Sequence, residues 1–188
     1  VRALLAAADI AGVPVRVHAI DTASSLDDDV LHDERVRSLI ADLDEPLPFR
    51  DASLDRIISC NVAEHLADPA EHLRECHRAL RPGGLLMFTS FGPDTLRELR
   101  NAWATVDDTP HVHGFIDMHD LGDTLMRTQF AEPVMDMEHI TLTYADVLSV
   151  MRDLKAIGAH NVARGRSPGL LGKQRYGRFV AAYESARL

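Results

Sequence analysis

The feature that most constrains the fold is a capped helix followed closely by an apolar strand. Asp68 is a favoured N-cap residue, Pro69 suits the first helical position, and Glu71 completes an approximate capping box. The turn Pro82-Gly83-Gly84 predicts the end of this helix, and the apolar run Leu85–Phe88 predicts a buried strand after it. This order of signals indicates a chain that alternates strands and helices.

Three strand-like segments precede the helix. They are short apolar runs with β-branched residues, at Val13–Ile20, Val36–Leu43 and Leu54–Cys60. The third of them, the helix and the strand after it together form a βαβ unit, which is the signature of a parallel sheet. We therefore expect an α/β fold that binds its ligand at the carboxyl ends of the strands.

The rest of the chain is predicted to be mainly helical, with one further strand. Apolar spacing predicts helices over Asp94–Val106, Met118–Thr128, Ala145–Ile157 and Leu170–Ala186. An alternating pattern predicts the strand over Glu132–Tyr144. No linker or repeat divides the sequence, so we expect one partial domain over 1–188, with a helical part around 145–188 that binds the acceptor or partner.

Charge, hydropathy and cysteine content exclude several classes of protein. The net charge of -9 argues against non-specific nucleic-acid binding, which needs an excess of Lys and Arg. The apolar runs are far shorter than the roughly 20 residues that span a bilayer, so no membrane span is expected. Cys60 and Cys76 form no disulfide framework, which indicates a reducing, cytoplasmic compartment.

Both ends of the sequence resemble the interior of a helix. The segment Val1–Ala11 is rich in helix-forming residues and has no N-cap before it, and Tyr183–Leu188 has no C-cap after it. We therefore expect the sequence to be a fragment.

Polar residues at predicted strand ends are the candidate ligand contacts. Asp21 and Asp42 each end a strand, where a carboxylate can accept hydrogen bonds from ribose hydroxyls. Either residue could instead be a helix cap or a solvated loop residue. Asn61 and His65 follow the third strand, and His65 is a candidate for orienting a substrate or transferring a proton.

The His-rich segment Pro110–Asp120 is not a convincing metal site. His111, His113 and His119 lack the spacing of a helical zinc site, and no nearby Cys adds a ligand. Asp120 could cap the next helix instead. We expect no metal.

Basic residues gather in the last third of this acidic chain. They are Arg152, Lys155, Arg164, Arg166, Lys173, Arg175 and Arg178. Solvated helix faces explain most of them. The alternative is a docking surface for an acidic partner, with one or two residues binding a substrate carboxylate.

Several motifs resemble a known enzyme family. The runs VHAID, IADLDEPLPF, LDRIISCN and LRPGGLLMFTSFG resemble the class I methyltransferases that use S-adenosylmethionine. The later runs FGPDTLRELRNAW, VDDTPHVHGFIDMHDLGDTL and LTYADVLSVMRDLKAIGAHNVARGR resemble the malonyl-[acyl-carrier protein] O-methyltransferases of biotin synthesis. The resemblance covers nearly the whole chain from Val15 onward.

The resemblance implies a Rossmann-like class I methyltransferase sheet, mostly parallel, with helices on both faces and without its first and last strands. It implies S-adenosylmethionine as the cofactor, with Asp21 at the ribose, Asp42 and Leu43 at the adenine, and Asn61 at the methionine end. The implied acceptor is malonyl-acyl carrier protein, or malonyl-CoA. Methylation of an ionised carboxylate needs no general base.

The substrate-binding candidates come partly from position and partly from the resemblance. They are His65, Phe91, His111, Arg152, Lys155 and Arg166. Phe91 ends the apolar strand and is expected to form a wall of the acceptor pocket, and Arg152 and Arg166 are the leading candidates to bind the carboxylate.

The sequence also departs from the family. No three of its 11 Gly residues form the glycine-rich loop that holds the cofactor, so we expect these 188 residues to bind S-adenosylmethionine poorly. The run AEHLADP is closer to quinone-type and other small-molecule methyltransferases. The alternatives are therefore such an enzyme, a methyltransferase-like assembly factor that hydroxylates protein arginine, or a non-catalytic interaction domain.

Overall fold

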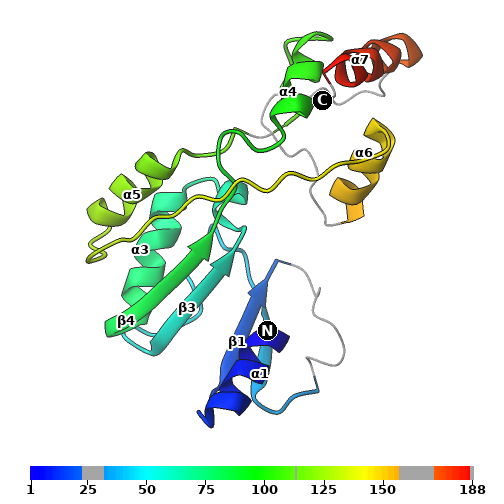
Figure 1. Cartoon of the computed structure of the whole chain (residues 1–188). Helices are drawn as coiled ribbons and strands as arrows, with labels where there is room; N and C mark the ends of the chain where they lie inside the picture. Colours follow the sequence, from blue (N-terminus) through cyan, green and yellow to red (C-terminus); the bar gives the residue numbers. More distant parts are fainter. Residues whose placement is uncertain (23–31, 113, 157–171, 187–188) are drawn as a thin grey trace. The chain divides into compact units, whose positions relative to one another are not determined.

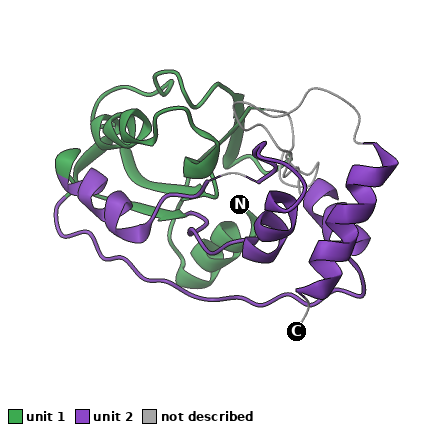
Figure 2. Ribbon diagram, turned by 90° about the horizontal axis from the view of Figure 1, so that it is seen from above, with its two compact units in different colours: residues 1–89, 127–130 green, residues 90–126, 131–188 purple. Residues whose placement is uncertain are grey.

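The computed structural model describes residues 1–22, 32–112, 114–156 and 172–186. It divides into two compact units, each of which is described by itself (Figure 2). Unit 1 comprises Val1–Thr89 and Arg127–Phe130, and unit 2 comprises Ser90–Met126 and Ala131–Leu188. The single partial domain with a helical part around 145–188 stays a prediction.

Unit 1 contains two pairs of parallel strands (Figure 1). Strand β1 (Val17–Asp21) pairs with β2 (Val36–Ile40), and β3 (Leu54–Cys60) pairs with β4 (Leu80–Thr89). The expectation of parallel strands is confirmed, and the third predicted strand has the expected bounds. Helix α1 (Arg2–Ala11) packs against the first pair, since Leu5 forms an apolar cluster with residues of β1 and β2.

Helix α3 (Pro69–Ala79) begins at the predicted cap. One oxygen of the Asp68 carboxylate accepts the backbone N–H groups of Ala70 at 2.9 Å and Glu71 at 3.1 Å. These bonds satisfy two of the helical donors that have no partner within the helix. Leu73, Cys76 and Ala79 form its buried stripe.

Replacing Asp68 with alanine is expected to lower the free energy of unfolding by about 1 kcal/mol, because two backbone donors lose their acceptor. Urea denaturation followed by far-UV circular dichroism measures this change. Asp68→Asn is the matched control, since asparagine caps equally well and should cost only a few tenths of a kcal/mol. Equal losses in both variants would contradict the capping role.

The predicted turn after α3 lies inside a strand. The helix ends at Ala79 and Leu80 already belongs to β4, whereas the sequence predicted a strand only from Leu85. Leu54 pairs with Leu80 and Arg56 pairs with Leu85, so Pro82, Gly83 and Gly84 bulge out of the ladder. Gly83 has a φ of 77°, and a Cβ on Gly84 would lie 2.8 Å from the carbonyl oxygen of Arg81. Both glycines are required by this bulge.

Strand β4 is buried on only one face in the described part of the chain. Leu86 and Phe88 are half-buried, but Leu85 is 43% exposed and Met87 is 56% exposed. Helix α3 packs against β4. Ile58 of the neighbouring strand β3 is exposed as well. The prediction of a buried strand is therefore correct only for alternate residues.

Unit 2 is built around a helical core. Its helices are α4 (Arg97–Ala104), α5 (Met118–Arg127, whose last residue falls in unit 1), α6 (Val147–Ala156) and α7 (Lys173–Ser185). Trp103 of α4, Val147 of α6 and Phe179 of α7 are buried in one apolar cluster. The four predicted helices are confirmed, with ends that differ by at most three residues. None of the helices in the described residues is long and apolar enough to cross a bilayer.

The predicted strand over Glu132–Tyr144 is wrong. Residues 133–144 form no regular ladder, and most of their apolar side chains are open to solvent, with Val134 92% exposed and Ile140 74% exposed. The alternating pattern is typical of a strand, but a strand also requires a hydrogen-bonding neighbour, and the described residues provide none there.

Candidate functional site

Asp21 and Asp42 lie at the same edge of the first strand pair. Asp21 is the last residue of β1 and is in register with Ile40, the last residue of β2. The carbonyl oxygen of Asp21 accepts the N–H of Ala41 at 3.1 Å, so the chain leaving β2 stays beside it. The two predicted carboxylates therefore follow adjacent parallel strands, where open α/β sheets bind ligands.

The loop after β2 is ordered by its own acidic residues. Asp42 is exposed, and its Oδ1 accepts the N–H of Asp44 at 3.0 Å. Asp44 Oδ1 in turn accepts the N–H of Ala67 at 2.7 Å, next to the start of α3. Leu43 is half-buried between these two contacts.

Asn61 joins the carboxyl ends of the second strand pair. Its N–H donates to the Thr89 carbonyl oxygen at 2.9 Å, and its side-chain Oδ1 accepts the Thr89 hydroxyl at 3.0 Å. Its φ of 52° lies in the left-handed region, which asparagine tolerates better than most residues. The side chain is exposed. Its carbonyl oxygen is the atom bonded to Thr89, so its amide N–H₂ group takes no part in that bond.

His65 lies four residues after Asn61 but is part of a short helix and not of a strand end. It ends a short 3₁₀ helix, η1 (Ala63–His65), and its side chain is exposed. Its N–H donates to the carbonyl oxygen of Val62 at 2.9 Å. Its role in substrate binding stays a prediction.

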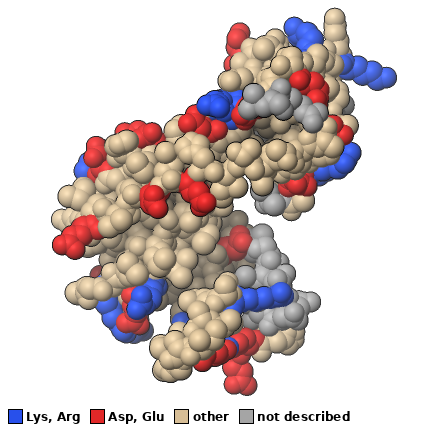
Figure 3. Space-filling view, in the orientation of Figure 1, with Lys and Arg blue, Asp and Glu red and all other residues tan. Residues whose placement is uncertain are grey.

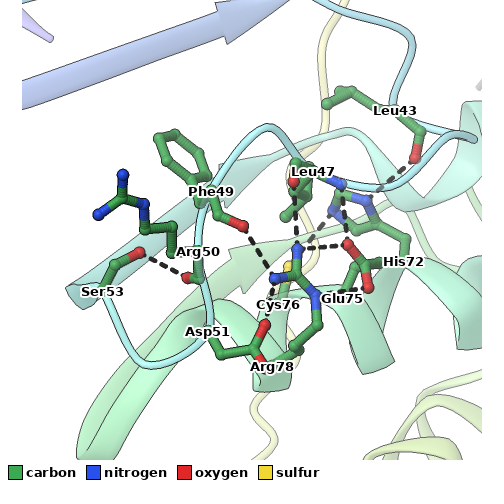
Figure 4. A network of polar contacts seen from close by, with 10 residues as sticks. All are labelled: Leu43, Leu47, Phe49, Arg50, Asp51, Ser53, His72, Glu75, Cys76 and Arg78. Atoms are coloured by element: carbon green, nitrogen blue, oxygen red, sulfur yellow. Dashed lines mark hydrogen bonds and ion pairs between the residues drawn. The ribbon is translucent and has the colours of Figure 1, made fainter.

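A polar network between α3 and the loop of residues 41–53 was not predicted (Figure 4). Arg78 donates to the carbonyl oxygens of Phe49 at 2.8 Å and Leu47 at 3.1 Å. It also forms a two-point ion pair with Glu75, whose Oε2 accepts the N–H of Leu47 at 2.9 Å. The Arg78 guanidinium holds the pKa of Glu75 below its ordinary value, so Glu75 is ionised at neutral pH.

A second contact in this network uses His72 and Cys76. His72 Nδ1 lies 3.2 Å from the Leu43 carbonyl oxygen, and its Nε2 lies 3.6 Å from Cys76 Sγ. Burial lowers the pKa of His72 and raises the pKa of Cys76 to about 12, so the ring is neutral and the thiol keeps its proton at pH 7. Because a carbonyl only accepts, the ring proton is assigned to Nδ1, and Nε2 accepts from the thiol.

The spacing of these residues is the signal that could have revealed the network. His72, Glu75 and Arg78 follow one another at intervals of three, which places them along one side of α3.

Unit 2 holds Phe91 and His111 in two different aromatic contacts. Phe91 is half-buried and meets Phe115 edge to face, with ring centroids 5.7 Å apart. His111 stacks on Trp103 at 3.9 Å, and its Nε2 lies 2.9 Å from Asp107 Oδ1. His111 therefore has internal partners, and its role as a substrate residue stays a prediction, as does that of Phe91.

The basic residues of the last third differ in their surroundings, because some have partners within unit 2 and others are exposed. Arg175 forms an ion pair with Asp107, and Arg178 donates to the carbonyl oxygen of Val106 at 3.3 Å. Arg152 and Lys155 are exposed on α6 and Lys173 is exposed at the start of α7, whereas Arg164 and Arg166 lie outside the described residues. Figure 3 shows acidic as well as basic side chains on the face in view. The two arginines with internal partners serve the fold of unit 2.

The His-rich segment forms no metal cluster among the described residues. No group of three or more His, Cys, Asp or Glu side chains is placed to hold a metal ion there. Asp117, rather than the predicted Asp120, accepts the N–H of His119 at 2.8 Å at the start of α5. His113 lies outside the described residues.

Comparison with known proteins identifies relatives by sequence. Residues 2–88 match the family described as "Methyltransferase domain". The chain is 55% identical over 147 residues to the malonyl-[acyl-carrier protein] O-methyltransferase of Laribacter hongkongensis, covering 78% of this chain and 49% of that protein. It is 44% identical over 174 residues to the protein of the same name from Halorhodospira halophila, covering 90% of this chain and 59% of the relative. The chain thus spans about half the length of these curated relatives.

Comparison with solved structures identifies the fold. YcgJ from Bacillus subtilis matches with a TM-score of 0.60 and 16% identity, over 94% of this chain and 70% of YcgJ. The [4+2]-cyclase SpnF matches with a TM-score of 0.51 and 19% identity, over 97% of this chain and 64% of that one. The comparisons confirm the expected α/β, Rossmann-like fold and the resemblance stated from the sequence.

Proposed function

We propose that this protein methylates the free carboxyl group of malonyl-acyl carrier protein, with S-adenosylmethionine as methyl donor. Residues 2–88 match the family described as "Methyltransferase domain", and the chain has the α/β, Rossmann-like fold, which supports this proposal. The reaction would serve biotin synthesis. The observation that carries this proposal is the 55% identity over 147 residues to an enzyme named for that activity.

Unit 1 would supply contacts to S-adenosylmethionine. Asp21 would accept hydrogen bonds from the ribose hydroxyls, Asp42 and Leu43 would lie at the adenine, and Asn61 would face the methionine end. Support comes from their positions, since each of these residues ends or follows a parallel strand at its carboxyl end. The Asn61 amide N–H₂ could donate to a carboxylate while its oxygen stays bonded to Thr89.

Unit 2 would supply contacts to the acceptor. A carboxylate with a pKa of about 4 is already ionised at neutral pH, so its oxygen can attack the methyl carbon while the bond from carbon to sulfonium breaks. Alignment of the two reactants and partial removal of water would then carry the catalysis. The attacking carboxylate needs a cationic partner, and we propose Arg152 or Arg166. Phe91, His111 and Lys155 of unit 2 would be further contacts to the acceptor, together with His65 of unit 1.

Charge and cysteine chemistry support the proposed partner and compartment. Arg152, Lys155 and Lys173 are exposed cations that would attract an acidic carrier protein. Cys60 and Cys76 are both free thiols, as expected of a protein that works in the reducing cytoplasm.

The proposal is tested with the complete gene product and S-adenosylmethionine that carries a labelled methyl group. We expect label to enter malonyl-acyl carrier protein as a base-labile methyl ester, and to enter malonyl-CoA more slowly. Acetyl-acyl carrier protein is the matched control acceptor, because it has the same thioester and no free carboxyl group. Labelling of a quinone precursor with no labelling of either malonyl thioester would overturn the proposal.

A different activity on the same fold is the second candidate. One structural neighbour is named as a cyclase, so this architecture alone does not determine the reaction. A complete gene product that binds the cofactor but labels no acceptor would favour this second candidate.

A further inference from the structure

The loop of residues 41–53 is held by α3 at three separate places. His72 bonds to Leu43 at its start, Glu75 and Arg78 bond to Leu47 and Phe49 in its middle, and two backbone bonds secure its end. Those two bonds run from the N–H groups of residues 52 and 53 to carbonyl oxygens at the end of α3, each at 2.9 Å. One helix therefore holds the start, the middle and the end of this loop.

Arg78 is the central residue of this arrangement. Its guanidinium donates to two loop carbonyl oxygens, to both oxygens of Glu75 and to Asp51. Five N–H donors in a fixed plane allow this, and lysine could not reproduce it. Glu75 is 15% exposed and Leu47 is buried, so the middle of the loop is fixed by contacts that are partly shielded from water.

His72 bonds to the backbone of Leu43, the residue after Asp42. The neutral ring donates from Nδ1 to the Leu43 carbonyl oxygen and is itself oriented by the Cys76 thiol behind it. This chain of two bonds fixes the peptide group that follows Leu43. Asp42 and Leu43 are the residues proposed above to lie at the adenine.

We infer that His72, Glu75 and Arg78 are positioning residues that hold the loop of residues 41–53 ready for the adenine end of S-adenosylmethionine. This inference rests on the proposed function. A loop that is ordered before binding avoids the conformational entropy cost that a mobile loop would incur when the ligand arrives. The three residues would thus affect cofactor affinity without touching the cofactor.

A purely structural role is the competing explanation, and it makes a different prediction. If the network only stabilises unit 1, variants lower the free energy of unfolding but leave the affinity of the folded protein unchanged. If the network positions the loop, the folded variant binds S-adenosylmethionine more weakly and the kcat for methyl transfer changes much less than the KM for the cofactor.

The test measures S-adenosylmethionine binding by calorimetry in the complete gene product. We expect Arg78→Ala to raise the dissociation constant at least 10-fold, with faster hydrogen exchange at the Leu47 amide, and Arg78→Lys to give an intermediate value. Arg74→Ala is the matched control, because Arg74 also pairs with a glutamate three residues earlier, Glu71, but bonds to no loop residue among the described contacts. Its dissociation constant should stay within 2-fold of wild type.

His72→Phe and His72→Asn provide a second pair in case Arg78→Ala does not fold. Phenylalanine removes the donor to Leu43 and should weaken binding, whereas asparagine can still donate near the Nδ1 position and should restore part of it. Binding within 2-fold of wild type in folded Arg78→Ala and His72→Phe would overturn the inference alone. Failure of the wild-type protein to bind the cofactor would overturn the proposed function and, with it, the assigned role of the loop.

Discussion

Replacing Phe179 with alanine is expected to lower the free energy of unfolding of unit 2 by about 3 to 5 kcal/mol. Phe179 of α7 has 0% exposure and stacks on Trp103 of α4 with ring centroids 3.9 Å apart. Among the described residues this is the largest fully buried side chain, and its truncation would leave a cavity in the apolar cluster that α4 and α7 share.

Fluorescence of Trp103 measures this loss during urea denaturation. The chain has a single tryptophan, so the signal reports unit 2 and not unit 1. Gln174→Ala is the matched control on the same helix, since Gln174 is exposed and its truncation should change stability by less than about 0.5 kcal/mol. A loss below 1 kcal/mol for Phe179→Ala would show that the aromatic stack is not the core of the unit.

Replacing Asp107 with asparagine is expected to have the second largest effect, about 1 to 3 kcal/mol at pH 7. The Asp107 carboxylate accepts bonds from the Thr109 N–H and hydroxyl groups, faces His111 at 2.9 Å, and pairs with Arg175 of α7. It therefore links the loop after α4 to α7. Asparagine keeps the shape but loses the charge and one acceptor oxygen, so Arg175 loses its ionic partner.

The contribution of Asp107 should depend on pH. Bonds from Thr109, followed by those from His111 and Arg175, hold the pKa of Asp107 well below its ordinary value of 3.8. A carboxyl whose pKa is lowered in the folded state stabilises that state above its unfolded pKa, and the benefit is lost as the pH falls toward the folded pKa. The part of the difference in unfolding free energy between wild type and Asp107→Asn that comes from the ionised carboxylate should thus be fully present at pH 5 and shrink below pH 4.

Urea titrations at pH 7, 5, 4 and 3 with Trp103 fluorescence would measure this difference. Subtracting the variant is necessary because Asp117 and Asp146 of unit 2 also have lowered pKa values. Asp108→Asn is the matched control on the adjacent residue, for which we expect the same stability as wild type across this range. A difference for Asp107→Asn that does not change with pH would contradict the ionic explanation.

Local signals predicted the elements of the fold where the cause is local. The Asp68 cap and the bounds of β3 follow from a few neighbouring residues, and both are confirmed. The strand predicted over residues 132–144 is wrong because alternation describes only one side of a pairing, and the described part of the chain places no strand beside this segment. The bulge at Gly83 was not predicted, because a Pro-Gly-Gly sequence is equally compatible with a bulge inside a strand and with a turn between two elements.

The candidate site residues that depend on local features could be selected from the sequence, whereas those that depend on contacts between distant segments could not. Strand ends are local features, so Asp21, Asp42 and Asn61 could be selected from the sequence, and the structure places them at the ends of paired strands. The partners of His111 and Arg175 could not be selected, because their contacts join residues of α4, α7 and the loop between α4 and α5. Resemblance to a family identifies which residues face a ligand but not which residues hold them in place.

The open segment of residues 132–144 also bears on how the protein behaves at high concentration. Its run HITLTY combines β-branched residues with no formal charge at neutral pH, and Ile140 and Leu142 are largely in contact with water. Such a segment is a template for pairing with the same segment of a second molecule. This short segment therefore favours self-association of the 188 residues at high concentration, and a single lysine introduced into it is expected to raise their solubility.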